Sequence, residues 1–94
     1  MDQLRKERIA QNEANARELN DRFGLGRFTC ECGDSSCFQV LRVPLEIYRS
    51  IRMDDRRFVI RPGHDVPEME DVVLERDDWA VVRKHDAVAH VVER

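Results

Sequence analysis

Three cysteines, which are all the cysteines of this 94-residue chain, lie within the stretch FTCECGDSSC. Cys30, Cys32 and Cys37 follow the spacing C-x-C-x4-C. Residues two apart on an extended strand point to the same side, so Cys30 and Cys32 can face one ion. The gap between Cys32 and Cys37 falls within the spacing that is usual between zinc ligands. The pattern therefore predicts a metal site built mainly from thiolates.

A structural zinc site has four protein ligands, and three histidines could supply the fourth: His64, His85 and His90. His64 is favoured because RPGHD is a proline-glycine loop after an expected strand, where a side chain can be aimed at a neighbouring loop. His85 follows a hairpin strand and is the second choice. His90 alternates with valines, which is typical of an ordinary strand position. The preference for His64 rests partly on the resemblance described below.

Three other interpretations of the cysteines are open. A disulfide is disfavoured by the odd number of cysteines and by the strain of a bridge across Cys-x-Cys. Thioredoxin-type redox sites use Cys-x-x-Cys, and a nucleophilic cysteine needs a nearby base; the stretch has neither. A [2Fe–2S] cluster of the CDGSH type also uses three cysteines and one histidine, but the CDG signature is missing here. We therefore expect Zn²⁺ in a structural role.

Three thiolates and one histidine fill the zinc tetrahedron and leave a net charge of about −1, which Arg27, Arg61 or backbone amides are expected to offset. A catalytic zinc keeps a position open for water, and this ligand set keeps none. Glu31 could be imagined as a general base, but we expect it to point away from the metal because its neighbours point toward it. The chain also has no phosphate loop, nucleophile elbow or dinucleotide fingerprint. We therefore do not expect an enzyme.

The remaining pattern predicts a single α+β domain with an N-terminal helix, a zinc knuckle leading into a small, mostly antiparallel sheet, and one short helix. The first helix is expected over residues 3–22, with a thin stripe formed by Ile9, Asn12, Ala16, Leu19 and Phe23. Strands are expected over residues 27–30, 38–43, 57–60, 72–76, 79–84 and 87–92, and the short helix over residues 44–53. We divide the chain into residues 1–24, a possible interaction arm, and residues 25–94, the zinc-stapled domain.

Charge gives a second functional hypothesis. The net charge is −3, yet residues 40–62 carry six arginines against three acidic residues. Four of these arginines could form a face that contacts nucleic-acid phosphates, and they are Arg49, Arg52, Arg56 and Arg57. An overall negative charge argues against this, and neighbouring acidic residues could pair with the same arginines.

The stretches FTCECGDSSC, VPLEIYRSIRMDDRRFVIRPGHDVPEMEDVV and WAVVRK together resemble a group of small zinc-binding proteins of actinobacteria. That group has the pattern C-E-C-x4-C, then a Glu-Tyr-containing helix, then R-F-x-V-x-P-G-H. The resemblance covers about residues 5 to 85. It implies that the metal ligands are Cys30, Cys32, Cys37 and His64, and it leaves the activity open.

The function expected from the sequence is that of a non-catalytic zinc protein in the cytoplasm, which acts as a regulatory or adaptor module for protein interaction. The N-terminal helix could contact the protein partner or a second copy of the chain, which would give a homodimer. The alternative is a nucleic-acid-binding zinc protein that uses the arginine-rich face. The N-terminal stretch has no secretory signal and no apolar run is long enough to span a membrane, so no membrane partner is expected.

Overall fold

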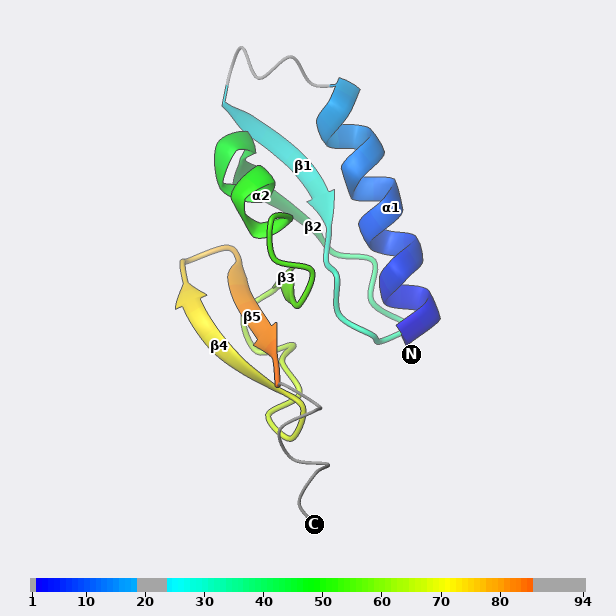
Figure 1. Cartoon of the computed structure of the whole chain (residues 1–94), viewed down its shortest axis with the longest axis vertical. Helices are drawn as coiled ribbons and strands as arrows, with labels where there is room; N and C mark the ends of the chain where they lie inside the picture. Colours follow the sequence, from blue (N-terminus) through cyan, green and yellow to red (C-terminus); the bar gives the residue numbers. More distant parts are fainter. Residues whose placement is uncertain (1, 19–23, 86–94) are drawn as a thin grey trace.

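A computed structural model describes residues 2–18 and 24–85 of the chain (Figure 1). The described residues form a mixed α+β fold, as the sequence predicts. In chain order the elements are α1 (Asp2–Glu18), β1 (Leu25–Thr29), β2 (Val40–Pro44), α2 (Leu45–Ile51), β3 (Arg57–Ile60), β4 (Glu70–Glu75) and β5 (Ala80–Lys84). Neither described helix has the length and apolar character that crossing a bilayer requires.

The strands form two antiparallel sheets instead of the single sheet expected. β1 pairs with β2, and the second sheet has the order β3-β5-β4. The two sheets meet at Glu31, whose backbone N donates to the carbonyl of Val59 on β3 at 2.8 Å. The Glu31 carboxylate then accepts from the Val59 N–H at 3.0 Å. One residue thus occupies the edge of β3 where a further strand would otherwise pair.

The core lies between the two sheets and α2. Alternate residues of β1 and β2 are buried, including Phe28, Leu41 and Val43, as the period of two in the sequence predicts. Phe28 stacks on Tyr48 of α2 with ring centroids 4.1 Å apart and planes 12° apart. A buried stacked pair of this kind stabilises the fold by about 0.5–1.5 kcal/mol beyond the burial of its area. β3 and β5 contribute the other half of the core.

Element boundaries differ modestly from the sequence prediction. α1 ends at Glu18 in the described structure, and the expected continuation to residue 22 lies outside the described residues, as does the expected strand over residues 87–92. α2 begins after Pro44, which is its N-cap residue, and is shorter than expected. The expected hairpin of residues 72–84 is present as β4 and β5, with a register shift between Val72 and Leu74.

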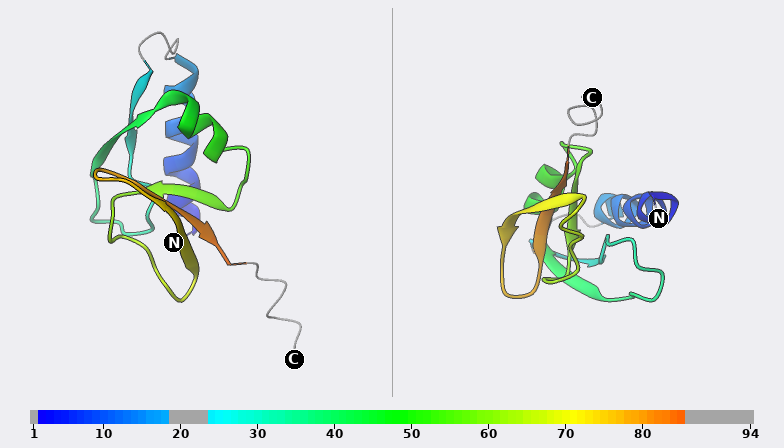
Figure 2. Two further views of the ribbon diagram at one scale, coloured as in Figure 1. Left: turned by 90° about the vertical axis from the view of Figure 1, so that its left-hand side faces the viewer. Right: turned by 90° about the horizontal axis from the view of Figure 1, so that it is seen from below.

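α1 runs beside the edge of β1 that β2 leaves free (Figures 1 and 2). Asn12 donates to the carbonyl of Thr29 at 2.8 Å and accepts from the Thr29 N–H at 2.9 Å. Asn15 donates to the carbonyl of Arg27, and Arg5 donates to the carbonyl of Glu31 at 2.8 Å. The helix therefore satisfies the backbone groups of a strand edge that would otherwise be open to another chain.

The buried face of α1 is largely polar, which explains why its apolar stripe is thin. Arg5, Arg8 and Asn12 are buried together with Ala16, and Ile9 packs against the core. The predicted stripe positions Leu19 and Phe23 lie outside the described residues. The exposed positions of α1 carry polar, charged or alanine side chains, namely Gln3, Lys6, Glu7, Ala10, Gln11, Arg17 and Glu18. Contact with a partner through α1 remains a prediction.

Candidate metal centre

The connection between β1 and β2 positions the three cysteines. Cys30 follows β1 directly, and its backbone N donates to the carbonyl of Gln39 at 2.9 Å, which extends the strand pairing. Asp34 shapes the rest of the loop, because its carboxylate accepts from the backbone N and the hydroxyl of Ser36. These two hydrogen bonds hold the pKa of Asp34 below its usual value. The Cys37 N–H closes the turn on the Asp34 carbonyl at 3.0 Å.

A turn over residues 61–64 aims His64 at the cysteines. The His64 N–H donates to the carbonyl of Arg61 at 3.0 Å, so these residues form a hydrogen-bonded turn with Pro62 and Gly63 at its centre. Gly63 has φ +92°, which a type II turn requires at its third residue and which side chains other than glycine rarely adopt. The Arg-Pro-Gly-His sequence thus fixes the direction from which the imidazole approaches.

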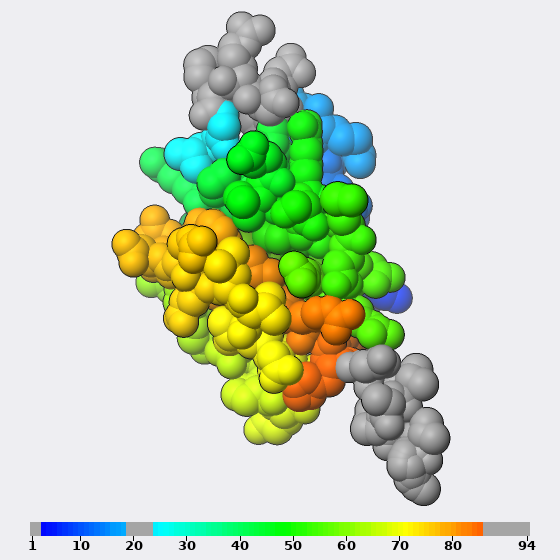
Figure 3. Space-filling view, turned by 60° about the vertical axis from the view of Figure 1, so that its left-hand side comes forward, coloured from blue at the N-terminus to red at the C-terminus, as the bar shows by residue number. Residues whose placement is uncertain are grey.

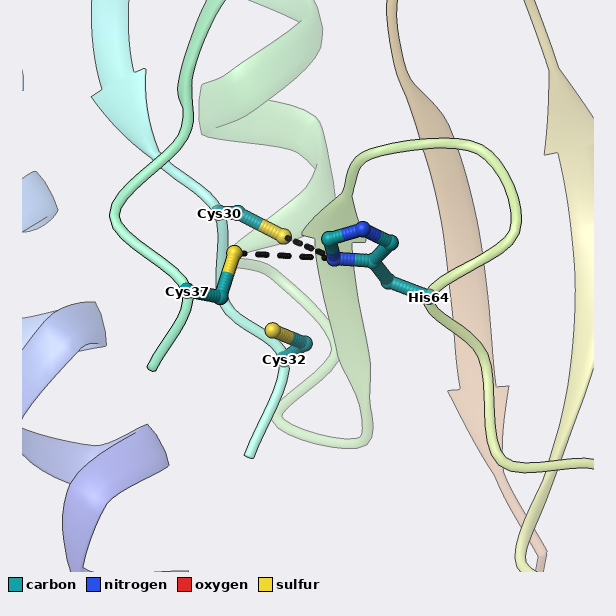
Figure 4. A group of neighbouring side chains, drawn as sticks. All are labelled: Cys30, Cys32, Cys37 and His64. Atoms are coloured by element: carbon teal, nitrogen blue, oxygen red, sulfur yellow. Dashed lines mark hydrogen bonds between the residues drawn. The ribbon is translucent and has the colours of Figure 1, made fainter. Parts of the chain in front are cut away.

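The four predicted ligands come together as a cluster (Figure 4). Their ligand atoms all lie within 4.8 Å of one another. His64 Nδ1 is 3.7 Å from Cys30 Sγ and 3.5 Å from Cys37 Sγ. Tetrahedral zinc with its usual bond lengths places a ligand nitrogen and a ligand sulfur about 3.6 Å apart. The cluster can therefore hold a metal ion of this size without rearrangement of the backbone.

The cluster is buried in a way that suits a cation. Burial raises the pKa of the Cys30 thiol to about 12, although the backbone N–H of Arg61 donates to its sulfur at 3.2 Å and opposes this rise. A thiolate is therefore unfavourable here unless a positive charge accompanies it. The expectation that backbone amides would help to offset the charge is met by the Arg61 N–H.

Arg8 of α1 is the principal contact that sequence reasoning missed. Its Nη1 donates to the carbonyl of Cys32 at 2.9 Å, and its Nη2 donates to the carbonyl of Cys37 at 2.7 Å. Nη1 also lies 3.7 Å from Cys32 Sγ. One guanidinium thus ties two ligand-bearing segments together and brings a positive charge to the thiolates. One sequence feature could have revealed this contact. Arg5, Arg8, Asn12 and Asn15 recur at helical spacing, which places these polar residues on one face of α1.

Glu31 points away from the metal cluster, as predicted, and forms the centre of a buried polar network. Its carboxylate accepts from Asn12 Nδ2 at 2.9 Å, from the Tyr48 hydroxyl at 2.6 Å and from the Val59 N–H. Burial raises the pKa of Glu31, while these hydrogen bonds and the charge of Arg52 lower it. Burial and the neighbouring Glu31 also raise the pKa of Tyr48. Glu31 therefore acts structurally, on the opposite side of the chain from the sulfurs.

The other predicted residues lie away from the cluster. His85 pairs with Asp71, with 3.1 Å between Nε2 and Oδ1, and His90 lies outside the described residues. Arg52, the C-cap residue of α2, approaches Glu31 to 4.0 Å and donates to the carbonyl of Arg57.

Asp54 accounts for part of the predicted arginine face. Its carboxylate lies 3.5 Å from Arg57 Nε and 2.9 Å from Arg83 Nε. The backbone N–H of Arg56 and the side chain of Arg83 donate to the Asp54 carboxylate, and this lowers its pKa. Arg49 and Arg56 also have partners within the chain. The assignment of Arg49, Arg52, Arg56 and Arg57 to nucleic acid remains a prediction.

Comparison of the chain with protein-family models, with curated proteins and with solved structures finds no match. The function must therefore be argued from the geometry of the cluster and of the surfaces around it.

Proposed function

We propose that this protein is a non-catalytic zinc protein whose ion is held by Cys30, Cys32, Cys37 and His64. The observation that carries the proposal is the separation of His64 Nδ1 from two of the sulfurs, 3.7 and 3.5 Å, because these are the edge lengths of a zinc tetrahedron. Thiolate-rich, four-ligand sites select zinc over magnesium or calcium, which prefer oxygen ligands.

The ion has a structural role in this proposal. Cys30 to Cys37 connect β1 and β2, whereas His64 lies in the loop after β3, so the ion joins the two sheets. Structural zinc stabilises small domains by an apparent 10–16 kcal/mol, about as much as the whole stability of a typical domain. A chain of this length buries a limited core, so the loss of the ion should unfold it.

The non-catalytic assignment follows from the ligand count. Three sulfurs and one nitrogen complete the tetrahedron, so no position is left for an activating water. Glu31, the carboxylate between Cys30 and Cys32 in the sequence, faces Asn12 and Tyr48 instead of the cluster. The protein therefore acts by binding, as a regulatory or adaptor module whose surface the ion stabilises.

Metal analysis of the reduced, purified protein tests the proposal. We expect one zinc per chain, colourless protein, and loss of the folded circular dichroism spectrum when a strong chelator removes the ion. Cys37→Ser should abolish stoichiometric zinc binding. Ser35→Ala in the same loop is the matched control and should leave the zinc content unchanged. A visible absorbance spectrum would indicate an iron–sulfur cluster instead, and a fully folded metal-free protein would refute the structural role.

A further inference from the structure

The pairing of β1 with β2 places two arginines directly opposite each other. Arg27 and Arg42 are register partners. The flanking backbone hydrogen bonds, from Cys30 N to Gln39 O and from Leu45 N to Gly24 O, show that this pair is a non-hydrogen-bonded one. Side chains come closest at such pairs, and like charges placed opposite each other destabilise a sheet. The arrangement therefore costs stability unless an anion lies between the two guanidinium groups.

Neither arginine has an ion-pair partner within the part of the chain that the structure describes, although Asp77 and Asp78 line a hollow together with Arg42. Both side chains are exposed, and no ion pair or side-chain hydrogen bond connects either guanidinium to a residue in 2–18 or 24–85. In this they differ from Arg52 and Arg57, which have carboxylate neighbours. A third cation, Arg61, lines the same surface hollow as Arg42 and Val40, and its exposed guanidinium contacts Gln39 at 3.4 Å.

The segment that leads into β2 carries an exposed aromatic ring, Phe38. Val40 and Arg42 share one side of β2, and Phe38, which precedes the strand by two residues, is 77% exposed. The guanidinium of Arg8 on α1 lies 5.9 Å from the centre of the Phe38 ring. The exposed Phe38 ring is a surface on which an unpaired base can stack.

We propose that the surface formed by Arg27, Arg42, Arg61, Phe38 and Val40 binds single-stranded nucleic acid. Guanidinium groups bind phosphates by paired hydrogen bonds, and exposed aromatic side chains stack on unpaired bases. A duplex buries its bases and would leave Phe38 unused. The inference rests on the proposed function in one respect, because the ion fixes Phe38 and Arg61 beside the β1–β2 sheet.

The end of the β4–β5 hairpin limits where the strand can lie. Asp77 and Asp78 line a hollow of about 440 Å³ opposite Arg42 and Arg61. The hairpin end lies next to the β1–β2 surface in Figure 3. These carboxylates repel phosphate, so we expect the nucleic acid to approach Arg42 from the side of Arg27, its register partner. Neutral residues at positions 77 and 78 should therefore strengthen binding.

Fluorescence anisotropy of a labelled oligothymidylate, titrated with the zinc-loaded full chain, tests the proposal. A probe of about 12 nucleotides exceeds the footprint of so small a face. With three phosphate contacts, a plot of the logarithm of affinity against the logarithm of salt concentration should have a slope of about −2. The affinity should therefore fall roughly 20-fold between about 50 and 200 mM salt. Arg27→Gln combined with Arg42→Gln should reduce that slope to about −0.7. Arg17→Gln on α1 is the matched control and should bind as the wild type does.

Two further variants separate base stacking from charge. Phe38→Ala should weaken binding between about fivefold and a hundredfold with little change in the salt slope. Asp77→Asn with Asp78→Asn should strengthen it about twofold at low salt. Zinc content and circular dichroism, measured on every variant, report on the metal site independently. A folded, zinc-loaded protein that does not bind the oligonucleotide therefore overturns the nucleic-acid proposal and leaves the zinc proposal standing. Equal binding by the double arginine variant overturns it, as does tighter binding of a labelled oligoglutamate peptide than of the oligonucleotide.

Discussion

Arg5 of α1 and Glu70 of β4 form a two-point ion pair, with Nη1 2.8 Å from Oε1 and Nη2 3.1 Å from Oε2. Both side chains are almost fully buried, and the Arg5 guanidinium also lies 4.4 Å from the centre of the Phe58 ring. Since Arg5 additionally donates to the Glu31 carbonyl, one side chain connects α1, the loop between β1 and β2, and the three-stranded sheet. α1 is thus attached to its own domain through polar contacts.

The first prediction concerns this ion pair. Arg5→Met should destabilise the zinc-loaded protein by about 3–5 kcal/mol, because the Glu70 carboxylate would remain buried without its partner. Urea unfolding followed by circular dichroism measures the change, and Lys6→Met on the exposed side of α1 is the control. Arg5→Met combined with Glu70→Leu should recover much of the loss. A stability loss by Arg5→Met no larger than that of the control would contradict the assigned role.

The second prediction concerns the buried network around Glu31. Glu31→Gln keeps the shape of the side chain but turns one acceptor into a donor, which would face the donors of Asn12, Tyr48 or Val59. Loss of about 1–3 kcal/mol is expected, since a buried donor is left unsatisfied. Thermal unfolding measures it, with Glu46→Gln on α2 as the exposed control. Because Glu31 faces away from the sulfurs, the zinc content should stay at one per chain.

The third prediction concerns Arg8. Arg8→Met should weaken zinc binding by about 10- to 100-fold, the usual effect of removing a group that orients metal ligands. The reason is that the guanidinium holds the carbonyls of Cys32 and Cys37 and brings a positive charge to the thiolates. Competition with a chromophoric chelator measures the affinity, and Arg17→Met in the same helix provides the comparison. Equal zinc affinities of the two variants would show that Arg8 does not support the metal site.

The fourth prediction is a pH dependence of metal binding. The metal-free chain is expected to be unfolded, and a cysteine in an unfolded chain has a pKa of about 8.5, so the Cys30 thiol carries its proton at neutral pH. The metal-bound form holds a thiolate, so each binding event releases at least this proton and affinity must rise with pH. We expect the logarithm of zinc affinity to increase by at least about one per pH unit near neutrality. Calorimetry in buffers of different ionisation enthalpy counts the protons, and a count of zero would be inconsistent with a Cys30 thiolate ligand.

Much of the site could be predicted from sequence because its determinants are local. The C-x-C spacing, the turn-forming residues after Cys32 and the Pro-Gly pair before His64 each act over a few residues. The choice among three histidines needed more than spacing, and the resemblance to the actinobacterial group supported His64. The structure brings that histidine to the cysteines.

The parts that sequence reasoning missed depend on contacts between distant segments. The polar face of α1 looks like an exposed surface in sequence, because arginine and asparagine are seldom buried. Its role is clear only when β1 lies alongside and presents Arg27 and Thr29 backbone groups to Asn15 and Asn12. For the same reason the division into two sheets was not foreseen, since it depends on Glu31 occupying the edge of β3.

X-ray absorption at the zinc edge of the purified protein tests the central claim most directly, because it reports the atoms bound to the ion. The account predicts three sulfur neighbours at about 2.3 Å and one nitrogen neighbour at about 2.0 Å, and replacement of His64 by alanine should remove the nitrogen contribution. A shell dominated by oxygen, a shell of four sulfurs, or folded protein without zinc would contradict it.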